Sequence, residues 1–409
     1  MTRQKYDVIV FGATSFVGQI LTRYMYEEFG LQGPLRWAAA GRSRPKLEEL
    51  RSSLGRGAGK LELLTADAGD TATLRELCAR GRVIVSTVGP YALYGEPVIK
   101  ACVESGTDYC DLTGEPQWMR RMLTKYEDAA RKSGARIVHC CGFDSIPSDL
   151  GVHFLQGQSR ARFGQTCPRV KMRVRRMRGT FSGGTFASTL NLLQEVAANP
   201  SLRRELADHY LLCPKDSRPG IRQHDVAFAE YDEDFGAWLA PFIMSSVNTR
   251  IVHRTNALSH QAYGREFRYE EAVMTGRGLR GRLNAAAIST GMGALMVAGS
   301  MGPTRRLLQR FLPAPGEGPS PEVQRKGGYD LRFLGRTQDG RTLRTRVTGD
   351  RDPGYGSTAK ILGQAAACLA LDVPKDKVAG GFWTTASIFG DKLIDRLRAH
   401  AGVQFDVLD

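Results

Sequence analysis

Strand-length apolar runs alternate with helical segments through the first third of this chain, and this alternation constrains the fold most. The six runs cover residues 6–12, 35–41, 60–67, 82–91, 107–112 and 135–142. The segments between them repeat apolar residues every three or four positions, which is typical of helices. Six strands that alternate with helices predict an α/β fold whose parallel sheet is covered by helices on both faces. Ligands of such sheets bind at the carboxyl ends of the strands, so these ends are the informative positions.

The first strand ends in the turn "FGATSFVG", residues 11–18. Gly12 lets the chain leave the strand sharply, and Gly18 lets the following helix pack closely against that strand. Backbone N–H groups at a helix start can hold a pyrophosphate. Ser15 stands where such a turn often has a third glycine, but serine caps helices well and its hydroxyl can donate to a phosphate. The turn therefore predicts a dinucleotide site, with a plain tight turn as the alternative.

The second strand end indicates which dinucleotide is bound. A site for NAD usually has an acidic residue there, whereas this chain has Arg42, Ser43 and Arg44 and no carboxylate before Glu48. Arginine forms paired, charge-assisted bonds to phosphate. NADPH is therefore the predicted cofactor, and solvated arginines at a helix start are the alternative.

Two further strand ends complete the predicted cofactor site. Asp67 follows the third strand, where its carboxylate can accept from the adenine amino group, and the fourth strand ends in a tight turn before Tyr91 and Tyr94. The predicted cofactor contacts are Gly12, Ala13, Thr14, Ser15, Phe16, Val17, Gly18, Arg42, Ser43, Asp67, Thr87, Val88, Gly89 and Pro90.

These strand ends resemble a known family. The segments "FGATSFVG", "AGRSRPKL", "STVGPYALYGEPVIKACVESGTDYCDLTGE" and "CGFDSIPSDLG" are similar to the saccharopine-dehydrogenase-like oxidoreductases, and within them to the mycobacterial trans-acting enoyl reductases. The resemblance extends through "SGGTFAS", "NTRIVHRTNAL", "YGREFRY" and "STAKILGQAAACLAL", so it covers nearly the whole chain. It implies a Rossmann domain that binds NADPH and a second α/β domain. Members usually have glycine in place of Ser15.

Beyond residue 147 the pattern changes to longer strands. Residues 169–179 and 248–258 are predicted to form partly exposed strands, and residues 327–336 and 341–350 form two more, joined by an Asp-Gly hairpin turn. We expect an NADP-binding domain over residues 1–147 and a substrate or lid domain, with a mostly antiparallel sheet, over residues 148–351. The family resemblance implies that the helices of residues 352–409 pack back on the first domain.

Residues 283–303 carry no charge and approach the length of a membrane span. Small residues dominate the stretch, so insertion into a bilayer would be weakly driven. A buried helix, or one between the two copies of a homodimer, is the favoured interpretation. Peripheral contact with a membrane is the other one, and it would suit a lipidic substrate.

The net charge of +15 favours anionic partners, such as an acidic carrier protein. The basic residues are dispersed, so no nucleic-acid partner is expected. The eight cysteines form no CxxC pair, and the N-terminus enters a strand directly, so we expect reduced thiols in a cytoplasmic protein, with membrane association as the open question. No metal-binding, serine-hydrolase or P-loop motif occurs in the sequence.

The resemblance implies the NADPH-dependent reduction of a carbon–carbon double bond, on an acyl or polyketide chain that is bound to a carrier or a lipid. Tyr91 and Tyr94 are the predicted proton donors, and the weaker candidate Asp144 is expected to be ionised and structural. His139 is expected to be a core residue. Two alternatives remain: a saccharopine-type reductase of an imine, and a non-catalytic, cofactor-binding protein on a membrane.

Overall fold

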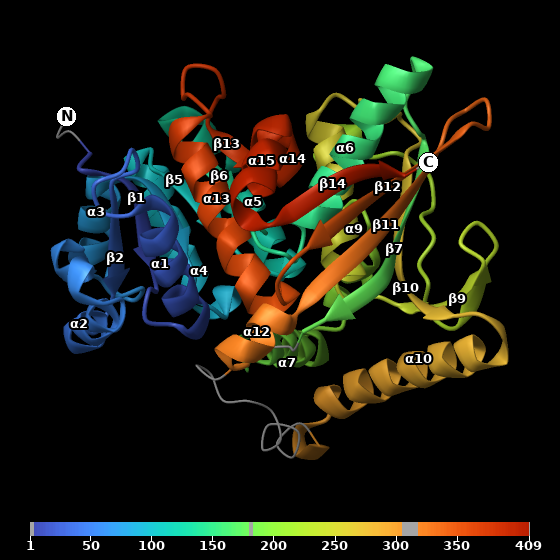
Figure 1. Ribbon diagram of the computed structural model, residues 1–409, viewed down its shortest axis with the longest axis horizontal. Helices are drawn as coiled ribbons and strands as arrows, with labels where there is room; N and C mark the ends of the chain where they lie inside the picture. Colours follow the sequence, from blue (N-terminus) through green and yellow to red (C-terminus); the bar gives the residue numbers. More distant parts are fainter. Residues whose placement is uncertain (1–3, 180–182, 305–317, 409) are drawn as a thin grey trace. The chain divides into compact units, whose positions relative to one another are not determined.

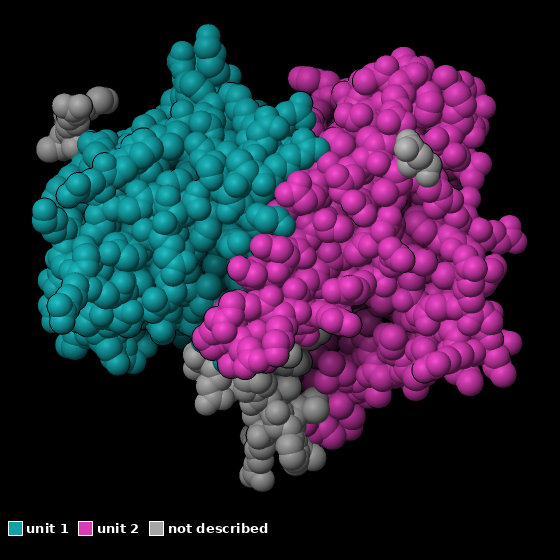
Figure 2. All heavy atoms as spheres, in the orientation of Figure 1, with its two compact units in different colours: residues 1–146, 315–318, 354–402 teal, residues 147–314, 319–353, 403–409 magenta. Residues whose placement is uncertain are grey.

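The computed structural model describes residues 4–179, 183–304 and 318–408, and they form two compact units. The first unit comprises residues 1–146, 315–318 and 354–402, and the second comprises residues 147–314, 319–353 and 403–409. Figure 2 colours the two units separately. Each is built around one seven-stranded sheet.

The sheet of the first unit is parallel throughout, as the sequence predicts. Its strand order is β13-β6-β5-β4-β1-β2-β3, so the order reverses at β1. The central residues of β1 have no exposed surface, which is typical of strands covered on both faces. The strands are β1 (Tyr6–Phe11), β2 (Trp37–Gly41), β3 (Leu63–Thr65), β4 (Gly81–Ser86), β5 (Asp108–Asp111), β6 (Arg136–Val138) and β13 (Gly381–Trp383).

Helices join and cover these strands in the first unit (Figure 1). They are α1 (Phe16–Phe29), α2 (Arg44–Ser53), α3 (Thr71–Arg80), α4 (Tyr91–Ser105), α5 (Pro116–Ser133), α13 (Thr358–Leu371), α14 (Thr385–Phe389) and α15 (Asp391–Arg396), with shorter turns at Arg56–Lys60, Pro353–Ser357 and Leu397–Ala401.

The segment that follows α13 is tied to this sheet by a buried ion pair. Arg136 in β6 binds Asp108 in β5, and both side chains are 1% exposed. The Arg136 guanidinium also donates to the carbonyl oxygens of Leu369 and Val373 at 3.2 and 2.6 Å. Removing one partner of such a pair leaves a buried charge without compensation and costs about 3–5 kcal/mol. Arg136 therefore holds the C-terminal end of α13 against the strands.

The sheet of the second unit is mixed, with the order β14-β12-β11-β7-β10-β9-β8. Every neighbouring pair is antiparallel except β7 and β10. The predicted hairpin is confirmed as β11 and β12. The strands are β7 (Arg169–Arg178), β8 (Glu230–Asp232), β9 (Ala237–Pro241), β10 (Arg268–Gly276), β11 (Gly328–Arg336), β12 (Thr342–Gly349) and β14 (Val403–Leu408). The helices are α6 (Ile146–Phe163), α7 (Gly183–Ala198), α8 (Ser201–Ala207), α9 (Ser245–Leu258), α10 (Gly278–Ser300) and α12 (Pro321–Lys326), with a short turn at Lys215–Ser217.

One sequence-based expectation about the elements is wrong, and two others hold only in part. Residues 248–258 form part of the helix α9 and not a strand. Most side chains of α9 are buried, polar and apolar alike, so the sequence lacks the apolar stripe that would have indicated a helix. The helices expected in the tail are present as α13, α14 and α15, and the tail also contains two strands that were not expected, β13 and β14, of which β14 pairs with β12. The uncharged stretch forms most of α10, which is largely exposed, so it is not a buried helix, and a place between two copies of a homodimer stays a prediction.

Candidate active site

The turn between β1 and α1 requires both of its glycines. Gly12 has φ +86°, and a Cβ there would lie 2.7 Å from Val88 Cγ2 and 2.8 Å from Thr87 Oγ1. A Cβ at Gly18 would lie 2.1 Å from the Gly12 carbonyl oxygen. The glycines therefore let the end of β4 and the first turn of α1 close around the end of β1, at the point where the strand order reverses.

Ser15 fits this turn without the freedom of glycine. Its φ of −68° and ψ of 163° are extended backbone that any residue adopts. The Ser15 Oγ accepts from the Gly18 N–H at 3.0 Å and lies 3.0 Å from Thr87 Oγ1. Thr87 donates its own proton to the Gly12 carbonyl at 2.9 Å, so Ser15 is the donor between the two hydroxyls. In this arrangement the Ser15 hydroxyl holds the turn together, and its contact with a phosphate stays a prediction.

The start of α1 has the donors that a pyrophosphate needs. Within the described part of the chain, the backbone N–H groups of Phe16 and Val17 donate to no acceptor, and the first turn of α1 has no acidic residue. The start of α4 differs, because the buried carboxylate of Glu115 accepts from the N–H groups of Tyr91 and Ala92, both at 2.9 Å. An anion is therefore favoured at α1 and not at α4.

The end of β2 provides a free positive charge beside this turn. Arg42 follows β2 directly and is exposed, and no ion pair or hydrogen bond of its guanidinium occurs among the described residues. Arg44 is engaged, since it binds Glu48 at 2.8 Å and the Leu63 carbonyl at 2.9 Å. Ser43 is the N-cap residue of α2, without a side-chain capping bond. Arg42 is thus the guanidinium available to a 2′-phosphate, and the turn, the free N–H groups and Arg42 together fit NADP.

The remaining predicted contacts lie at the same edge of the sheet. Asp67 follows β3 and is exposed, and its Oδ1 accepts from the Gly69 N–H at 2.8 Å, which leaves Oδ2 toward solvent. Thr87 and Val88 follow β4 and contact the position of Gly12. The Gly89–Pro90 peptide bond is cis.

The two predicted tyrosines differ in their surroundings. The Tyr91 side chain is 4% exposed, and its hydroxyl donates to the Ser86 carbonyl at 2.9 Å and accepts from the Leu112 N–H at 3.3 Å. Burial raises the pKa of Tyr91 well above its ordinary value. Tyr94, in the first turn of α4, is 49% exposed, and its hydroxyl has no partner among the described residues. The geometry therefore gives Tyr91 a role in packing, whereas the exposed Tyr94 hydroxyl can still reach a substrate.

The turn after β6 contains an acidic group that the sequence undervalues. Asp111, at the end of β5, accepts from the backbone N–H groups of Thr113 and Cys140, both at 3.1 Å, and pairs with His139 Nδ1 at 2.7 Å. His139 is buried, as expected of a core residue. Asp144 lies in the same turn and is partly accessible. Its own burial and the negative charge of Asp111 raise the pKa of Asp144 to about 7, so part of this carboxyl stays protonated near neutral pH.

The second unit has a buried polar cluster between α6, α9 and β10. Glu271 accepts from the Tyr269 hydroxyl at 2.7 Å and from Asn248 Nδ2 at 3.0 Å, and Asn248 also donates to Ser148 Oγ at 3.1 Å. Burial raises the pKa of Glu271 to about 7. On β7, Arg173 holds the carboxylates of Asp232 and Glu270.

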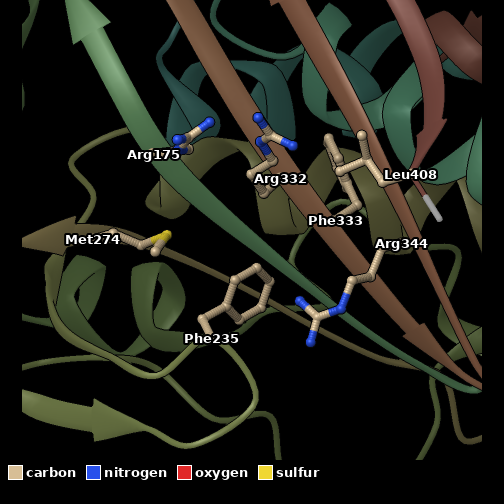
Figure 3. A pocket seen from close by; sticks show the side chains of 7 residues that line it. All are labelled: Arg175, Phe235, Met274, Arg332, Phe333, Arg344 and Leu408. Carbon is tan, nitrogen blue, oxygen red and sulfur yellow. The ribbon is translucent and has the colours of Figure 1, made fainter. Parts of the chain in front are cut away.

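A basic cavity of about 370 Å³ lies on the sheet of the second unit (Figure 3). Its polar lining consists of three guanidinium groups, and among the described residues only Asp330 forms ion pairs with them. The Arg344 guanidinium lies 5.3 Å from the centre of the Phe235 ring. The cavity is lined by Arg175, Phe235, Met274, Arg332, Phe333, Arg344 and Leu408.

Comparison with known proteins places the chain in a family. Residues 8–138 match the saccharopine dehydrogenase NADP-binding domain. A Mycobacterium tuberculosis protein named as a trans-acting enoyl reductase is 39% identical over 98% of this chain and 97% of its own length, and trans-acting enoyl reductases of Mycobacterium bovis and Mycobacterium ulcerans are 35% and 34% identical over at least 96% of both chains. Saccharopine dehydrogenase (L-Glu forming) of Saccharomyces cerevisiae shares the fold, with a TM-score of 0.54 at 13% identity over 98% of this chain and 99% of that one. The chain therefore belongs to the saccharopine-dehydrogenase-like oxidoreductases, in the group of the trans-acting enoyl reductases, and it uses NADP.

Proposed function

We propose that the protein reduces an activated carbon–carbon double bond on a bulky acyl or polyketide chain that is presented by an acidic carrier protein or a lipid intermediate. The observation that carries this proposal is the identity of 34–39% over nearly the whole chain to relatives named as trans-acting enoyl reductases. The N–H groups of α1 and the Arg42 guanidinium, which have no partner among the described residues, support the cofactor part of the proposal.

The first unit binds and orients the cofactor in this proposal. Bound NADPH supplies a hydride for the β-carbon of the substrate. Phe16 and Val17 donate their backbone N–H groups to the pyrophosphate, and Arg42 binds the 2′-phosphate. Gly12 and Gly18 add no side chain to the turn between β1 and α1, so its backbone can approach the dinucleotide closely.

The α-carbon must also receive a proton. Tyr91 is a poor source, because its hydroxyl proton is engaged by the Ser86 carbonyl in a buried position. Tyr94 and Asp144 both keep accessible acidic groups near the carboxyl ends of the strands. A group with a pKa close to the working pH is the more effective general acid. The pKa of about 7 therefore favours Asp144 as the donor, with Tyr94 as the other candidate.

The basic cavity of the second unit supports an anionic carrier. Two of the three guanidinium groups, those of Arg175 and Arg332, pair with the single carboxylate of Asp330, which leaves net positive charge beside the apolar side chains of the cavity. A surface of this kind suits an acidic protein that carries an apolar group. The chain's net charge of +15 favours the same class of partner.

The experiment is to measure oxidation of NADPH by the full chain with matched enoyl thioesters, aldehydes and imines. The proposal predicts turnover with enoyl thioesters, and faster turnover when the acyl chain is on an acidic carrier protein. Turnover with imines alone would contradict it in favour of a saccharopine-type reductase. Tight binding of NADPH without turnover of any substrate would contradict it in favour of a non-catalytic protein.

A further inference from the structure

The helix α10 buries small side chains and leaves large apolar side chains exposed, which is the reverse of an ordinary surface helix. Its buried residues are the small Gly281, Ala285, Ser289 and Gly299. The large apolar side chains point outward instead, and three of them are more than 60% exposed: Leu279 at 70%, Leu283 at 61% and Val297 at 63%. Met296 and Met301 are also more than half exposed. In Figure 1, α10 runs as one long helix along the edge of the second unit.

Small side chains let α10 pack closely on its own unit, while its large apolar side chains stay exposed. Gly281 lies so close to Gly276 that a Cβ would be 2.4 Å from the Gly276 carbonyl oxygen, and a Cβ at Gly299 would meet Leu193 of α7 at 2.4 Å. Large apolar side chains exposed along a helix are a feature of surfaces that bind a partner or a membrane. The uncovered face of α10 is therefore a candidate docking surface.

The charges around α10 indicate which partner covers this face. Arg277, Arg280 and Arg282 stand at its start and are exposed, and none of them has an acidic partner among the described residues. The sequence has no Asp or Glu between Ala272 and Gly316. Uncovered apolar side chains beside unpaired arginines match the two layers of an anionic lipid surface, in which phosphates lie above hydrocarbon.

We propose that α10 docks the protein on an anionic lipid bilayer, lying in the plane of the surface. Among the described residues, α10 is the one helix that is long and apolar enough to cross a membrane. Its packing on β9, β10 and α7 favours a helix that lies on the bilayer instead of spanning it. A second copy of the chain is a less suitable occupant, since two chains of charge +15 repel each other and an anionic bilayer attracts both.

The test is flotation of the full chain with vesicles of phosphatidylcholine alone and of phosphatidylcholine mixed with phosphatidylglycerol. We expect co-flotation with the anionic vesicles, weaker binding at high salt and little binding to the neutral vesicles. Equal binding to both kinds of vesicle, or no binding to either, would overturn the proposal. The readout is binding and not turnover, so it can fail while the proposed reaction holds.

Two pairs of variants separate the apolar from the charged contribution. The double variant Leu283→Ser/Val297→Ser removes apolar side chains that are already exposed, and it should lower partitioning into anionic vesicles by about tenfold or more. Phe228→Ser is its control, because Phe228 is 58% exposed elsewhere in the same unit. Arg277→Ala/Arg280→Ala should weaken binding by about tenfold or more and reduce its salt dependence, whereas Arg203→Ala/Arg204→Ala in α8 removes the same charge and should have a small effect.

Circular dichroism shows whether the variants are folded, and light scattering shows whether the protein is a monomer or a dimer. If the Leu283→Ser/Val297→Ser variant is folded and still binds anionic vesicles like the unaltered protein, the proposal is wrong. It is also wrong if the unaltered protein is a dimer that this variant dissociates, because the apolar face would then be covered by a second copy.

Discussion

Arg42 is the residue on which the choice between NADPH and NADH depends. It follows β2, is exposed and has no partner in the described structure, whereas Arg44 is held by Glu48 and the Leu63 carbonyl. We predict that Arg42→Ala weakens NADPH binding by about 10- to 100-fold, since a charge-assisted bond to the 2′-phosphate is lost. Binding of NADH should change by less than about twofold, because NADH lacks that phosphate.

Calorimetric titration with both cofactors measures this effect. Arg56→Ala is the matched control, because Arg56 is exposed in the same unit and its loss changes the net charge equally. Equal losses of affinity for NADPH and NADH in Arg42→Ala would place the 2′-phosphate elsewhere.

The proton donor can be identified by the pH dependence of turnover. If Asp144 is the donor, kcat should fall as pH rises above about 7, since the active form is the protonated carboxyl. Asp144→Asn should then lower kcat by about a hundredfold or more and remove this decline, with cofactor affinity unchanged. Tyr94→Phe and Tyr91→Phe should retain the decline. A hundredfold loss in Tyr94→Phe, with Asp144→Asn nearly normal, would assign the proton to Tyr94.

Among single residues, the sequence indicates those that lie at strand ends, but it does not show a pKa shift that depends on neighbours in space. Gly12, Gly18 and Arg42 could be predicted because the end of a strand is visible in the sequence. The pKa of Asp144 could not, because it depends first on its burial in the fold and then on Asp111, which is brought close only when β5 and β6 pair. The Ser15 hydroxyl is engaged by Thr87 for the same reason, across β1 and β4.

At the scale of elements, α9 shows why sequence pattern is a weak guide inside a polar core. Every residue from Val247 to Asn256 is buried, including Arg250 and His253. Burial lowers the pKa of His253 to about 3, so this side chain is neutral in the folded protein. A helix surrounded on all sides does not show the apolar stripe of a surface helix, so its sequence pattern does not identify it as a helix.

The polar cluster between α9 and β10 makes the stability of the second unit depend on pH. The folded protein keeps the Glu271 proton up to about pH 7, whereas the unfolded chain releases it near the ordinary value of 4.5. The folded state thus binds more protons between these values, so stability falls as pH rises through this window. The shift in pKa corresponds to about 3 kcal/mol of unfolding free energy.

We predict that Glu271→Gln, which cannot titrate, loses this part of the pH dependence. Denaturant unfolding at several pH values between 5 and 8 should show the variant gaining stability relative to the unaltered protein as pH rises. Glu322→Gln in α12 is the control, since Glu322 is exposed and pairs with Lys326 at the surface. Parallel stability curves for Glu271→Gln and the unaltered protein would show that Glu271 is ionised in the folded state.

At the scale of the whole molecule, local patterns predicted the parallel sheet and could not predict how distant segments complete both sheets. β13 extends the first sheet beside β6, and the last strand β14 pairs with β12, as in the contact of Leu408 with Arg344. Short strands at the end of a chain carry little periodicity, and their pairing is decided by long-range contacts. The net charge of +15 favours anionic ligands whichever segments carry it, and an anionic partner stays a prediction.

The measurement that tests the account most directly follows a deuteride from the cofactor to the product. The full chain is incubated with NADPH that is deuterated at its transferable position and with an enoyl chain on an acidic carrier protein, and the product is analysed by mass spectrometry and NMR. The account predicts a saturated acyl chain with one deuterium, located on the β-carbon, and a much lower yield with equally labelled NADH. Deuterium on a carbonyl-derived or imine-derived carbon, or an unchanged enoyl chain beside bound NADPH, would contradict it.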